Sequence, residues 1–468
     1  MWWNTEVTNE ALCDLTAIEM RSLLSAGDLS ARELLGAHLE RIERINPSVN
    51  AIVTLVPELA TDRALKADEA FANGESLGLL HGLPVAHKDL ADTAGVRTTL
   101  GSPIFRDRVP EHDDLIVERQ REAGAVMVGK TNVPEFGAGS QTFNEVFGVT
   151  SNPYDTSVTC GGSSGGAAVA LAARMIALAD GSDLGGSLRN PASFCNVVGF
   201  RPSGGRVPTV PNSQLWIPMA TTGPMARTVA DLRLGLSIIA GRHAKDPRTV
   251  DVPLTGPVPS PLRAGIVTAI PGCELPPATI AAIEKSGEIL SAQGWEVTTV
   301  EPPELERVLD VWGNILLEGM ADGLEEMSNL LSPEIHQQLI EVEKYFNPGS
   351  GSLNATLGER QRLRILWSQF LTEHTVVVGP TWTNLPFPCN ADLIPVSGAE
   401  LVVNTLRFIV PGNALGIPGL ALPMGVEDGL ATGVQIYADL WRDDLCILAG
   451  QCIERGVDAI TPIDPKSG

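Results

Sequence analysis

The sequence predicts an α/β fold, in which a large, twisted mixed β-sheet is sandwiched between layers of α-helices. Short apolar runs with strand character alternate with longer helical patterns along the whole chain, and this alternation is typical of α/β architectures. The chain has 468 residues, of which 44% are hydrophobic, so it can bury an extensive core. A mixed sheet that is largely buried follows from these two observations.

The helices are predicted from signals at their ends. Ser30 and Glu33 form a capping-box pattern at the start of one helix, and Asn46-Pro47 is expected to end it. Asp231 in the first turn of a helix over 228–240 suits the helix dipole. The apolar, alanine-rich segment 167–179 is also expected to be helical. The other helices are expected over residues 15–25, 61–73, 113–122, 277–293, most of 304–346, 357–374, 404–415 and 440–455.

The strands are predicted from short apolar runs that lie between turn signals. A strand, a helix and a strand over 262–300 predict a β-α-β unit. The proline-rich stretch 248–261 is the best candidate for an internal boundary. We nevertheless expect a single domain over residues 1–468, with a mainly helical part around 270–375 that caps a pocket. The other strands are expected over residues 51–56, 83–87, 125–128, 197–200, 206–207, 375–378, 420–422 and 433–437.

Charge and cysteine content limit the classes of partner. A net charge of −23 argues against a nucleic-acid partner, because phosphate binding needs a basic surface. The N-terminus lacks a secretory-signal pattern, and no apolar run reaches the roughly 18 residues of a membrane span. Seven scattered cysteines without a close C-x-x-C pair fit free, mostly buried thiols in a reducing cytoplasm. We therefore expect a cytoplasmic monomer or homodimer that binds neither nucleic acid nor a membrane.

The histidines give no sign of a metal centre. None of the seven forms an H-E-x-x-H motif, and no carboxylate stands at ligand spacing from His81 and His87. We expect neither a metal nor a cofactor.

Two glycine-flanked serine clusters lie on either side of segment 167–179. The first covers residues 161–166 (GGSSGG) and contains Ser163, and the second covers residues 185–187 (GGS) and ends at Ser187. Glycine allows backbone N–H groups to approach a ligand closely. A serine beside such glycines can be a nucleophile next to its own oxyanion hole. The alternative is a pair of flexible glycine loops without chemistry.

Lys88 is a candidate base for such a serine. A serine hydroxyl becomes a good nucleophile when a base takes its proton, and lysine can be that base only when it is neutral. Burial favours the neutral form by lowering the pKa of the amine. The residues around Lys88 are apolar, namely 83–86 before it and 90–91 after Asp89. The alternative is a surface lysine at a strand end that pairs with Asp89.

Two other motif matches predict different chemistry and fit their surroundings poorly. Residues 124–131 match the phosphate-binding pattern G-x-x-x-x-G-K-T, but a helix precedes Gly124 and strand residues fill the gap. Residues 162–166 match the nucleophile elbow G-x-S-x-G, which needs a buried strand before it and a late histidine. Residues 154–159 are not strand-like, and His374 lies within or at the end of a helix. We expect neither nucleotide binding nor a histidine-based triad.

Taken together, the motifs resemble those of the amidase signature family of serine hydrolases. The resemblance is carried by CGGSSGGAAVALAARMIALADGSDLGGSLRNPASFCNVVGFRPS, by HGLPVAHKDLADTAGVRTTLGS upstream and by NALGIPGLALPMG downstream, and it extends over nearly the whole chain. It implies a Ser–Ser–Lys triad, with Ser187 as nucleophile, Ser163 as the bridging serine after a cis peptide bond, and Lys88 as base. It also implies an oxyanion hole made by the N–H groups of Leu184, Gly185, Gly186 and Ser187.

The resemblance further implies acyl transfer and assigns supporting residues. Three residues that flank the serines are expected to support the loops from outside the reacting centre, with a surface ion pair as the alternative for the first two: Asp183, Arg189 and Ser164. By family position, the backbone near Gly137 and Ala138 should lie close to the substrate. Trp216 and Ile217 are expected in an apolar pocket wall, although packing against the core explains them equally well.

An open, apolar pocket would suit aryl amides, anilides or carbamates, and also esters, so the expected relatives are aryl acylamidases and urethanases. The alternative within the family is the A-type subunit of a tRNA-dependent amidotransferase. The sequence shows no arrangement of arginine and aspartate that marks a glutamine site, which favours the free-standing hydrolase.

Overall fold

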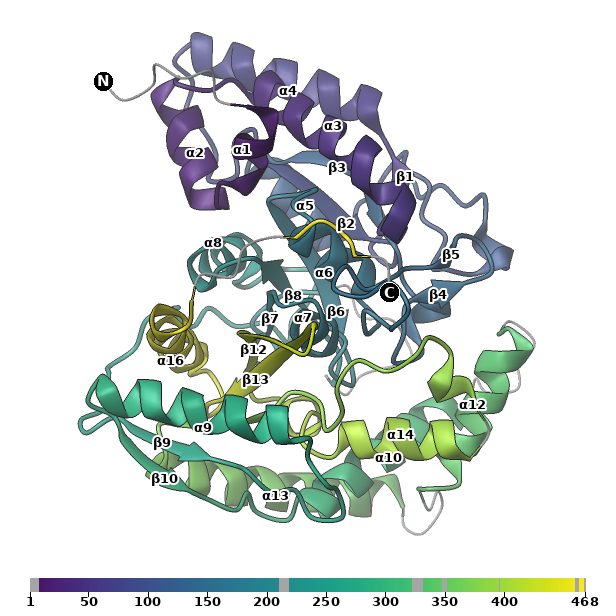
Figure 1. Cartoon of the computed structure of the whole chain (residues 1–468), viewed down its shortest axis with the longest axis vertical. Helices are drawn as coiled ribbons and strands as arrows, with labels where there is room; N and C mark the ends of the chain where they lie inside the picture. Colours follow the sequence, from purple (N-terminus) through teal and green to yellow (C-terminus); the bar gives the residue numbers. More distant parts are fainter. Residues whose placement is uncertain are drawn as a thin grey trace.

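An eleven-stranded mixed sheet forms the framework of the protein (Figure 1). The computed structural model describes residues 8–209, 219–321, 331–346, 352–394, 396–458 and 463–466. The order of the strands across the sheet is β1-β3-β2-β6-β8-β7-β12-β13-β11-β9-β10. Their bounds are β1 Ile52–Leu55, β2 Pro84–Lys88, β3 Val126–Thr131, β6 Leu178–Asp183, β7 Val198–Arg201, β8 Thr221–Ala226, β9 Arg263–Ile266, β10 Glu296–Thr299, β11 Val376–Pro380, β12 Gly419–Glu427 and β13 Leu430–Tyr437.

The sheet has two parallel parts with an antiparallel part between them, and at one edge β1 pairs antiparallel with β3. Strands β3, β2 and β6 run parallel to one another, as do β11, β9 and β10. The strands from β6 through β13 to β11 pair antiparallel. A separate two-stranded ribbon, β4 (Phe143–Asn144) and β5 (Gly148–Val149), lies outside this sheet. The mixed α/β architecture that the sequence predicts is confirmed.

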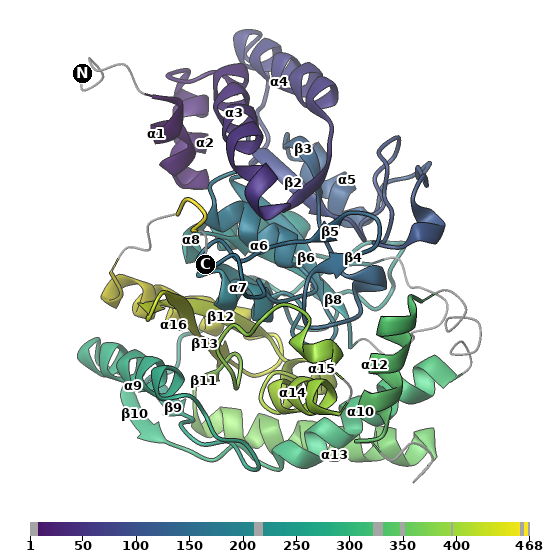
Figure 2. The same cartoon turned by 45° about the vertical axis from the view of Figure 1, so that its right-hand side comes forward.

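Helices cover the sheet and gather at its two ends. Helices α1 to α4 lie at the β1 end, and α9, α10, α12, α13 and α14 lie at the opposite end (Figures 1 and 2). The bounds are α1 Asn9–Asp14, α2 Ala17–Ala26, α3 Ala31–Val49, α4 Pro57–Ala72, α5 Leu115–Glu122, α6 Gly165–Ala172, α7 Arg189–Phe194, α8 Val229–Ile239, α9 Pro277–Ala292, α10 Leu305–Ala321, α12 Pro333–Glu343, α13 Leu353–Glu373, α14 Ser397–Leu406, α15 Pro411–Leu415 and α16 Asp443–Gly456.

Two short helices, α6 and α7, lie at the centre of the molecule, and every residue of both is buried. Small residues let α6 pack against its neighbours, since a Cβ placed on Gly166 would lie only 2.3 Å from the backbone nitrogen of Asn132. Helix α6 begins within the first serine cluster, at Gly165, and α7 begins two residues after Ser187, at Arg189. The core therefore holds both clusters in place, close to the end of β2.

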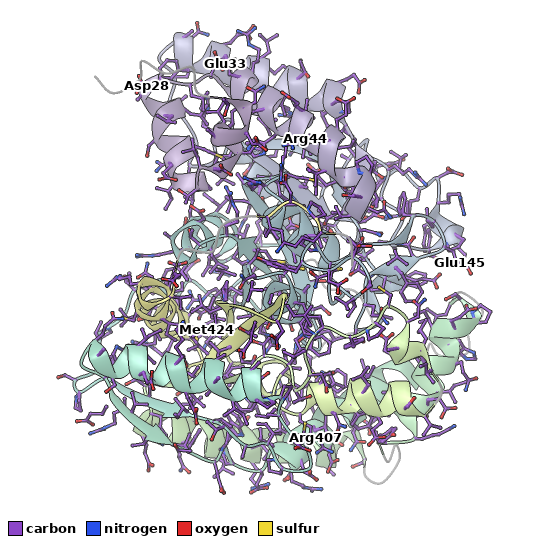
Figure 3. The ribbon with its side chains drawn as sticks, in the orientation of Figure 1. Asp28, Glu33, Arg44, Glu145, Arg407 and Met424 are labelled. Atoms are coloured by element: carbon purple, nitrogen blue, oxygen red, sulfur yellow. The ribbon has the colours of Figure 1, made fainter. Side chains whose placement is uncertain are left out.

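Charged side chains are among those at the surface of the protein. Asp28, Glu33 and Glu145 are exposed at the periphery (Figure 3).

All seven cysteines are free, and five of them are buried, as expected. Among the described residues, no helix has the length and apolar character needed to cross a membrane.

Several local predictions are confirmed. Ser30 and Glu33 form a complete capping box at the start of α3. The Thr228 side chain caps α8 by accepting the N–H of Asp231. Strands β9 and β10 pair in parallel on either side of α9 in sequence, which is the β-α-β unit expected over 262–300.

The predicted end of α3 at Asn46-Pro47 is wrong, because the helix continues to Val49. Pro47 lies in the last turn, where its missing N–H removes a single hydrogen bond. Asn50 then ends the helix in the left-handed region (φ 52°), and its N–H donates to the Asn46 carbonyl at 2.7 Å.

The central segments also differ from the prediction. Segment 167–179 is not one helix, because α6 ends at Ala172 and β6 begins at Leu178. Strand β6 contains glycine and aspartate, and the unexpected β8 contains glycine and proline after two threonines, so neither is an apolar run. The ladders on both sides of each strand determine their conformation. Residues 206–207 form a bend and not a strand. The helix expected over 404–415 is divided into α14 and α15, the second of which starts at Pro411.

Candidate active site

Lys88, the last residue of β2, is buried with 1% of its surface exposed. Its Nζ donates to Ser163 Oγ at 2.7 Å and to Ser182 Oγ at 3.1 Å. The carbonyl of Ser182 is a third acceptor, at 3.4 Å. Asp89 takes no part in this arrangement, since its carboxylate accepts the N–H of Thr99. The alternative of a surface lysine paired with Asp89 is therefore wrong.

Burial lowers the pKa of Lys88 to about 7, although the carboxylates of Asp183 and Asp180 act in the opposite direction. Asp180 Oδ1 accepts the backbone N–H of Lys88 at 3.0 Å, and Oδ2 accepts Gln120 Nε2 at 2.9 Å. His87 Nδ1 also contacts Oδ2. Because Asp180 is satisfied by these groups, it holds the end of β2 in place without an ion pair to the Lys88 amine. A large share of Lys88 is then neutral at neutral pH.

The first serine cluster is tightly packed. The Gly162–Ser163 peptide bond is cis, as the family resemblance implies. A Cβ placed on Gly162 would lie 2.6 Å from the Gln141 carbonyl oxygen. Thr142 Oγ1 donates to the Gly161 carbonyl at 2.8 Å. Close approach of two backbone segments explains these glycines, so the alternative of flexible loops does not apply.

Asp183 organises the second serine cluster from the end of β6. Its carboxylate accepts the N–H of Gly186 at 2.8 Å and that of Leu188 at 3.2 Å, which ties the loop around it. Arg189 donates to the same carboxylate through Nε and Nη2, each at 3.0 Å. Asn413 Nδ2 donates to Oδ1 at 2.9 Å. This carboxylate therefore fixes the loop that carries Ser187.

The Asp183–Arg189 pair is fully buried, with 0% of either side chain exposed, so it is not the surface ion pair left open above. Burial would raise the pKa of Asp183, but the Arg189 guanidinium holds it well below its usual range. A buried carboxylate of this kind stays ionised because its hydrogen bonds and its cation replace water.

The hydrogen bonds of the loop reduce the number of N–H groups that could donate to an oxyanion. The N–H of Gly186 already donates to Asp183, so its assignment as an oxyanion donor needs correction. Within the described ranges, the N–H groups of Leu184, Gly185 and Ser187 have no hydrogen-bond partner. These three remain the candidate donors.

A backbone hydrogen bond joins the two serine clusters, because the N–H of Ser164 donates to the carbonyl of Ser187 at 3.1 Å. The hydroxyl of Ser164 is buried and has no hydrogen-bond partner in the part of the chain that the structure describes. Ser164 thus supports the site through its backbone. The half-buried Ser187 hydroxyl likewise has no partner among the described residues.

Of the predicted substrate-binding residues, Gly137 lies beside Ser163, since a Cβ placed on Gly137 would be 3.5 Å from Ser163 Oγ. Its φ of 74° also favours glycine. Ala138 follows it and is half-buried. Trp216 and Ile217 lie outside the described residues.

Sequence reasoning missed three residues that form hydrogen bonds with Lys88 or with the chain just before Ser187. Ser182 accepts from Lys88, and Asn413 binds both the carboxylate and the main-chain carbonyl of Asp183. Trp312 Nε1 donates to the Leu184 carbonyl at 2.8 Å. Asn413 stands in the quoted NALG segment, which offered a signal. No local pattern marks Trp312, because a long-range contact alone gives it this position.

The two rival motifs do not form the sites that they predict. Residues 126–131 are strand β3, and Lys130 is buried, with Nζ 3.0 Å from Thr93 Oγ1. A strand cannot cradle phosphate as a loop does. His374 caps the end of α13 and packs with its ring centre 4.9 Å from that of Phe370.

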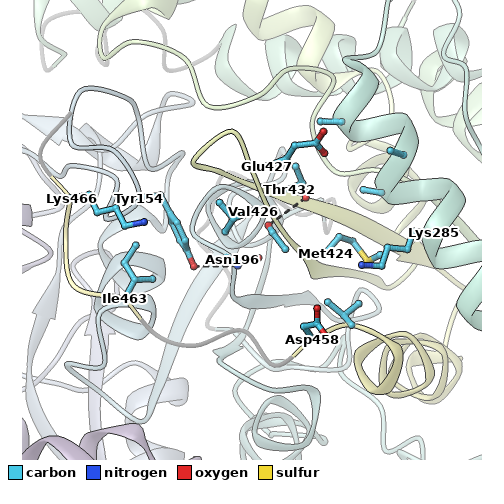
Figure 4. A pocket seen from close by; sticks show the side chains of 15 residues that line it. Tyr154, Asn196, Lys285, Met424, Val426, Glu427, Thr432, Asp458, Ile463 and Lys466 are labelled. Carbon is cyan, nitrogen blue, oxygen red and sulfur yellow. Dashed lines mark hydrogen bonds between the residues drawn. The ribbon is translucent and has the colours of Figure 1, made fainter.

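A cavity of about 530 Å³ lies between α9, the β12–β13 hairpin and the C-terminal segment, and Tyr154, Asn196 and Lys285 are among its lining residues (Figure 4). No predicted site residue lines it. A smaller cavity of about 120 Å³ borders Lys88, Asp180 and Ser182. Over the described ranges, no cluster of three or more metal-ligating side chains occurs.

Comparison with known proteins gives concordant matches over most of the chain. A family model described as Amidase matches residues 33–447. The chain is similar to indoleacetamide hydrolase of Bradyrhizobium diazoefficiens, with 34% identity over 450 residues that cover 94% of this chain and 86% of the relative. It is also similar to the A-type subunit of glutamyl-tRNA(Gln) amidotransferase from Salinispora tropica, with 33% identity covering 96% and 99% of the two chains. Among solved structures, 6-aminohexanoate cyclic dimer hydrolase in complex with substrate has a TM-score of 0.85 and 26% identity, covering 97% and 99%.

Proposed function

Because this chain belongs to the amidase family and is thus a hydrolase that acts on amides, we propose that it is a stand-alone enzyme cleaving the C–N bonds of small aryl and arylalkyl amides. One observation carries the proposal. A buried lysine with a lowered pKa lies 2.7 Å from Ser163 Oγ, and the Ser163 loop is joined by a backbone hydrogen bond to the loop that ends at Ser187.

The hydrogen bonds of Lys88 suit it to act as a base. A neutral amine has two hydrogens and one lone pair. The two oxygens of Ser182, at 3.1 and 3.4 Å, can accept the two hydrogens. The lone pair is then directed at Ser163, and the contact reverses so that the Ser163 O–H donates to Nζ. Ser182 thereby selects the orientation in which Lys88 can accept a proton.

The reaction proceeds in two halves. Lys88 takes the proton of Ser163, Ser163 takes that of Ser187, and Ser187 Oγ forms a bond to the amide carbon. The carbonyl oxygen becomes negative and is bound by the free N–H groups of Leu184, Gly185 and Ser187. The C–N bond then breaks, and the proton returns through Ser163 to the leaving amine. Water attacks the acyl-enzyme by the same proton path and releases the carboxylic acid.

The substrate class is supported by the glycine beside Ser163 and by the relatives. Gly137 has no side chain to fill the region next to Ser163 Oγ. A similar protein is named indoleacetamide hydrolase, which is consistent with an aryl group on the acyl side. Anilides, carbamates and esters present the same carbonyl to Ser187 and are the further candidates.

The second candidate function is the A-type subunit of a tRNA-dependent amidotransferase, and the similarity to the Salinispora tropica protein supports it. The lone purified chain distinguishes the two. We expect it to hydrolyse p-nitroacetanilide or indole-3-acetamide without any partner, with kcat/KM on the order of 10⁴ M⁻¹ s⁻¹ for the better substrate. Released amine or ammonia is the measurement. Activity that appears only after the other amidotransferase components are added would favour the second candidate.

The pH dependence tests the protonation state of Lys88. With a pKa of about 7, Lys88 is mostly charged below that pH and mostly neutral above it, and only the neutral form accepts a proton. We therefore expect kcat/KM to rise through about pH 7 and to level off at higher pH. Initial rates across this range, with a substrate that does not titrate, measure it. A rate that falls as pH rises through 7 would contradict the role of Lys88 as base.

A further inference from the structure

The loop before Ser187 is held from outside by a tryptophan from a distant part of the chain. Trp312 lies on α10, 128 positions from Leu184, and its indole N–H donates to the Leu184 carbonyl at 2.8 Å. Its side chain is 5% exposed. The ring also packs edge-on against Phe346, which follows α12, with ring centres 6.1 Å apart. A rigid, buried donor therefore contacts the main chain of the predicted oxyanion loop.

This hydrogen bond determines where the next N–H points. Leu184 O and Gly185 N belong to one planar peptide group, and in a trans peptide the C=O and N–H point in opposite directions. Leu184–Gly185 is not one of the cis bonds found among the described residues. Because the Trp312 indole holds the Leu184 carbonyl, the Gly185 N–H points away from the indole. That N–H is one of the three without a hydrogen-bond partner in the described ranges.

Gly185 and Trp312 also fit each other sterically. A Cβ placed on Gly185 would lie 3.1 Å from Trp312 Cζ2 and 3.6 Å from Leu406 Cδ2. The glycine lets the indole approach the main chain closely enough to donate. Glycine also leaves this peptide free to rotate unless something restrains it, and the indole hydrogen bond supplies that restraint.

We infer that Trp312 is a positioning residue, which aims the Gly185 N–H at the oxygen that becomes negative in the transition state. The inference rests on the proposed function. It assigns part of the catalytic geometry to α10, a helix in the mainly helical part of the chain and remote in sequence from the serine clusters. Trp312 itself touches neither Ser187 nor Ser163 through any hydrogen bond.

The test compares two substitutions, each of which removes an indole N–H that donates to a main-chain carbonyl. Trp312→Phe keeps an aromatic ring and removes the N–H. Trp367→Phe is the matched control, because Trp367 is also buried and its Nε1 donates to a main-chain carbonyl, that of Pro303, at 2.9 Å. Since loss of a whole oxyanion donor costs about 10²–10³ in kcat, we expect Trp312→Phe to lower kcat about tenfold or more with little change in KM. Trp367→Phe should leave kcat within about twofold.

A second readout separates positioning from loss of stability. Trifluoroacetophenone adds to a reactive serine and forms an oxyanion, so its inhibition constant reports on the oxyanion hole. Trp312→Phe should weaken this inhibition by the same factor as kcat, and the control should not. If the phenylalanine variant fails to fold, β-(3-benzothienyl)alanine at position 312 keeps the shape of the indole and replaces only the N–H.

Two results would overturn the inference while leaving the proposed function intact. One is wild-type-like kcat and inhibition in the position-312 variants. The other is an equal loss of kcat in Trp312→Phe and Trp367→Phe that follows their melting temperatures. An inactive wild-type enzyme that is also not labelled by a fluorophosphonate would instead remove the proposed function.

Discussion

Replacing Ser187 by alanine should lower kcat for amide hydrolysis by about 10⁴-fold or more, because the acyl-enzyme cannot form without its nucleophile. The fold should be unchanged, since the Ser187 hydroxyl has no hydrogen-bond partner among the described residues. Single-turnover and steady-state assays with an anilide measure the loss. Thermal unfolding of the variant should match that of the wild type.

Ser193→Ala is the matched control for this prediction. Ser193 is a buried serine on α7, the helix that follows Ser187, so its replacement makes the same chemical change six residues away. We expect a change in kcat of less than about threefold. A Ser187→Ala enzyme that keeps more than about a hundredth of the wild-type kcat would contradict the assignment of the nucleophile.

Replacing Lys88 by alanine should lower kcat/KM by about 10³-fold or more, since general-base catalysis contributes about 10²–10⁴ and the cavity also disturbs Ser163. Lys88→Arg makes the test sharper. Arginine keeps the positive charge but does not become neutral in the working pH range. The arginine variant should therefore be as inactive as the alanine variant, and its residual rate should not rise through pH 7.

His374→Ala is the control for the rival triad. The His374 ring packs on Phe370 at the end of α13, so we expect less than about a twofold change in rate. An inactive His374→Ala enzyme, or an active Lys88→Arg enzyme, would mean that the base is not Lys88.

The parts of the fold that the sequence could predict are those that local chemistry determines. The capping box at Ser30 and the β-α-β unit over β9, α9 and β10 depend on residues close in sequence, and both were found. Strands β6 and β8 were missed because glycine, aspartate and proline interrupt the apolar run that signals a strand, and the ladders on both sides hold them in the sheet. Pro47 shows the reverse case, in which a strong local stop signal falls in the last turn of the helix and has little effect.

In the candidate site too, features set by nearby residues could be predicted and features set by distant contacts could not. Flanking glycines marked Ser163 and Ser187, apolar neighbours marked Lys88, and the family resemblance implied their roles. The structure places Lys88 against Ser163. The sequence could not show that the Asp183 carboxylate accepts the N–H of Gly186, because that depends on how the loop turns. It could not find Trp312 either, since the contact joins two segments 128 positions apart. The catalytic roles themselves remain predictions.

The most direct test of the Ser–Ser–Lys account is the site at which the enzyme is labelled. A fluorophosphonate should react once per chain, and peptide mapping by tandem mass spectrometry should place the adduct on Ser187. Lys88→Ala should slow the labelling without moving it. An adduct on Ser163 or Ser164 in the wild-type enzyme, or labelling of Ser187 at an unchanged rate in Lys88→Ala, would contradict the account.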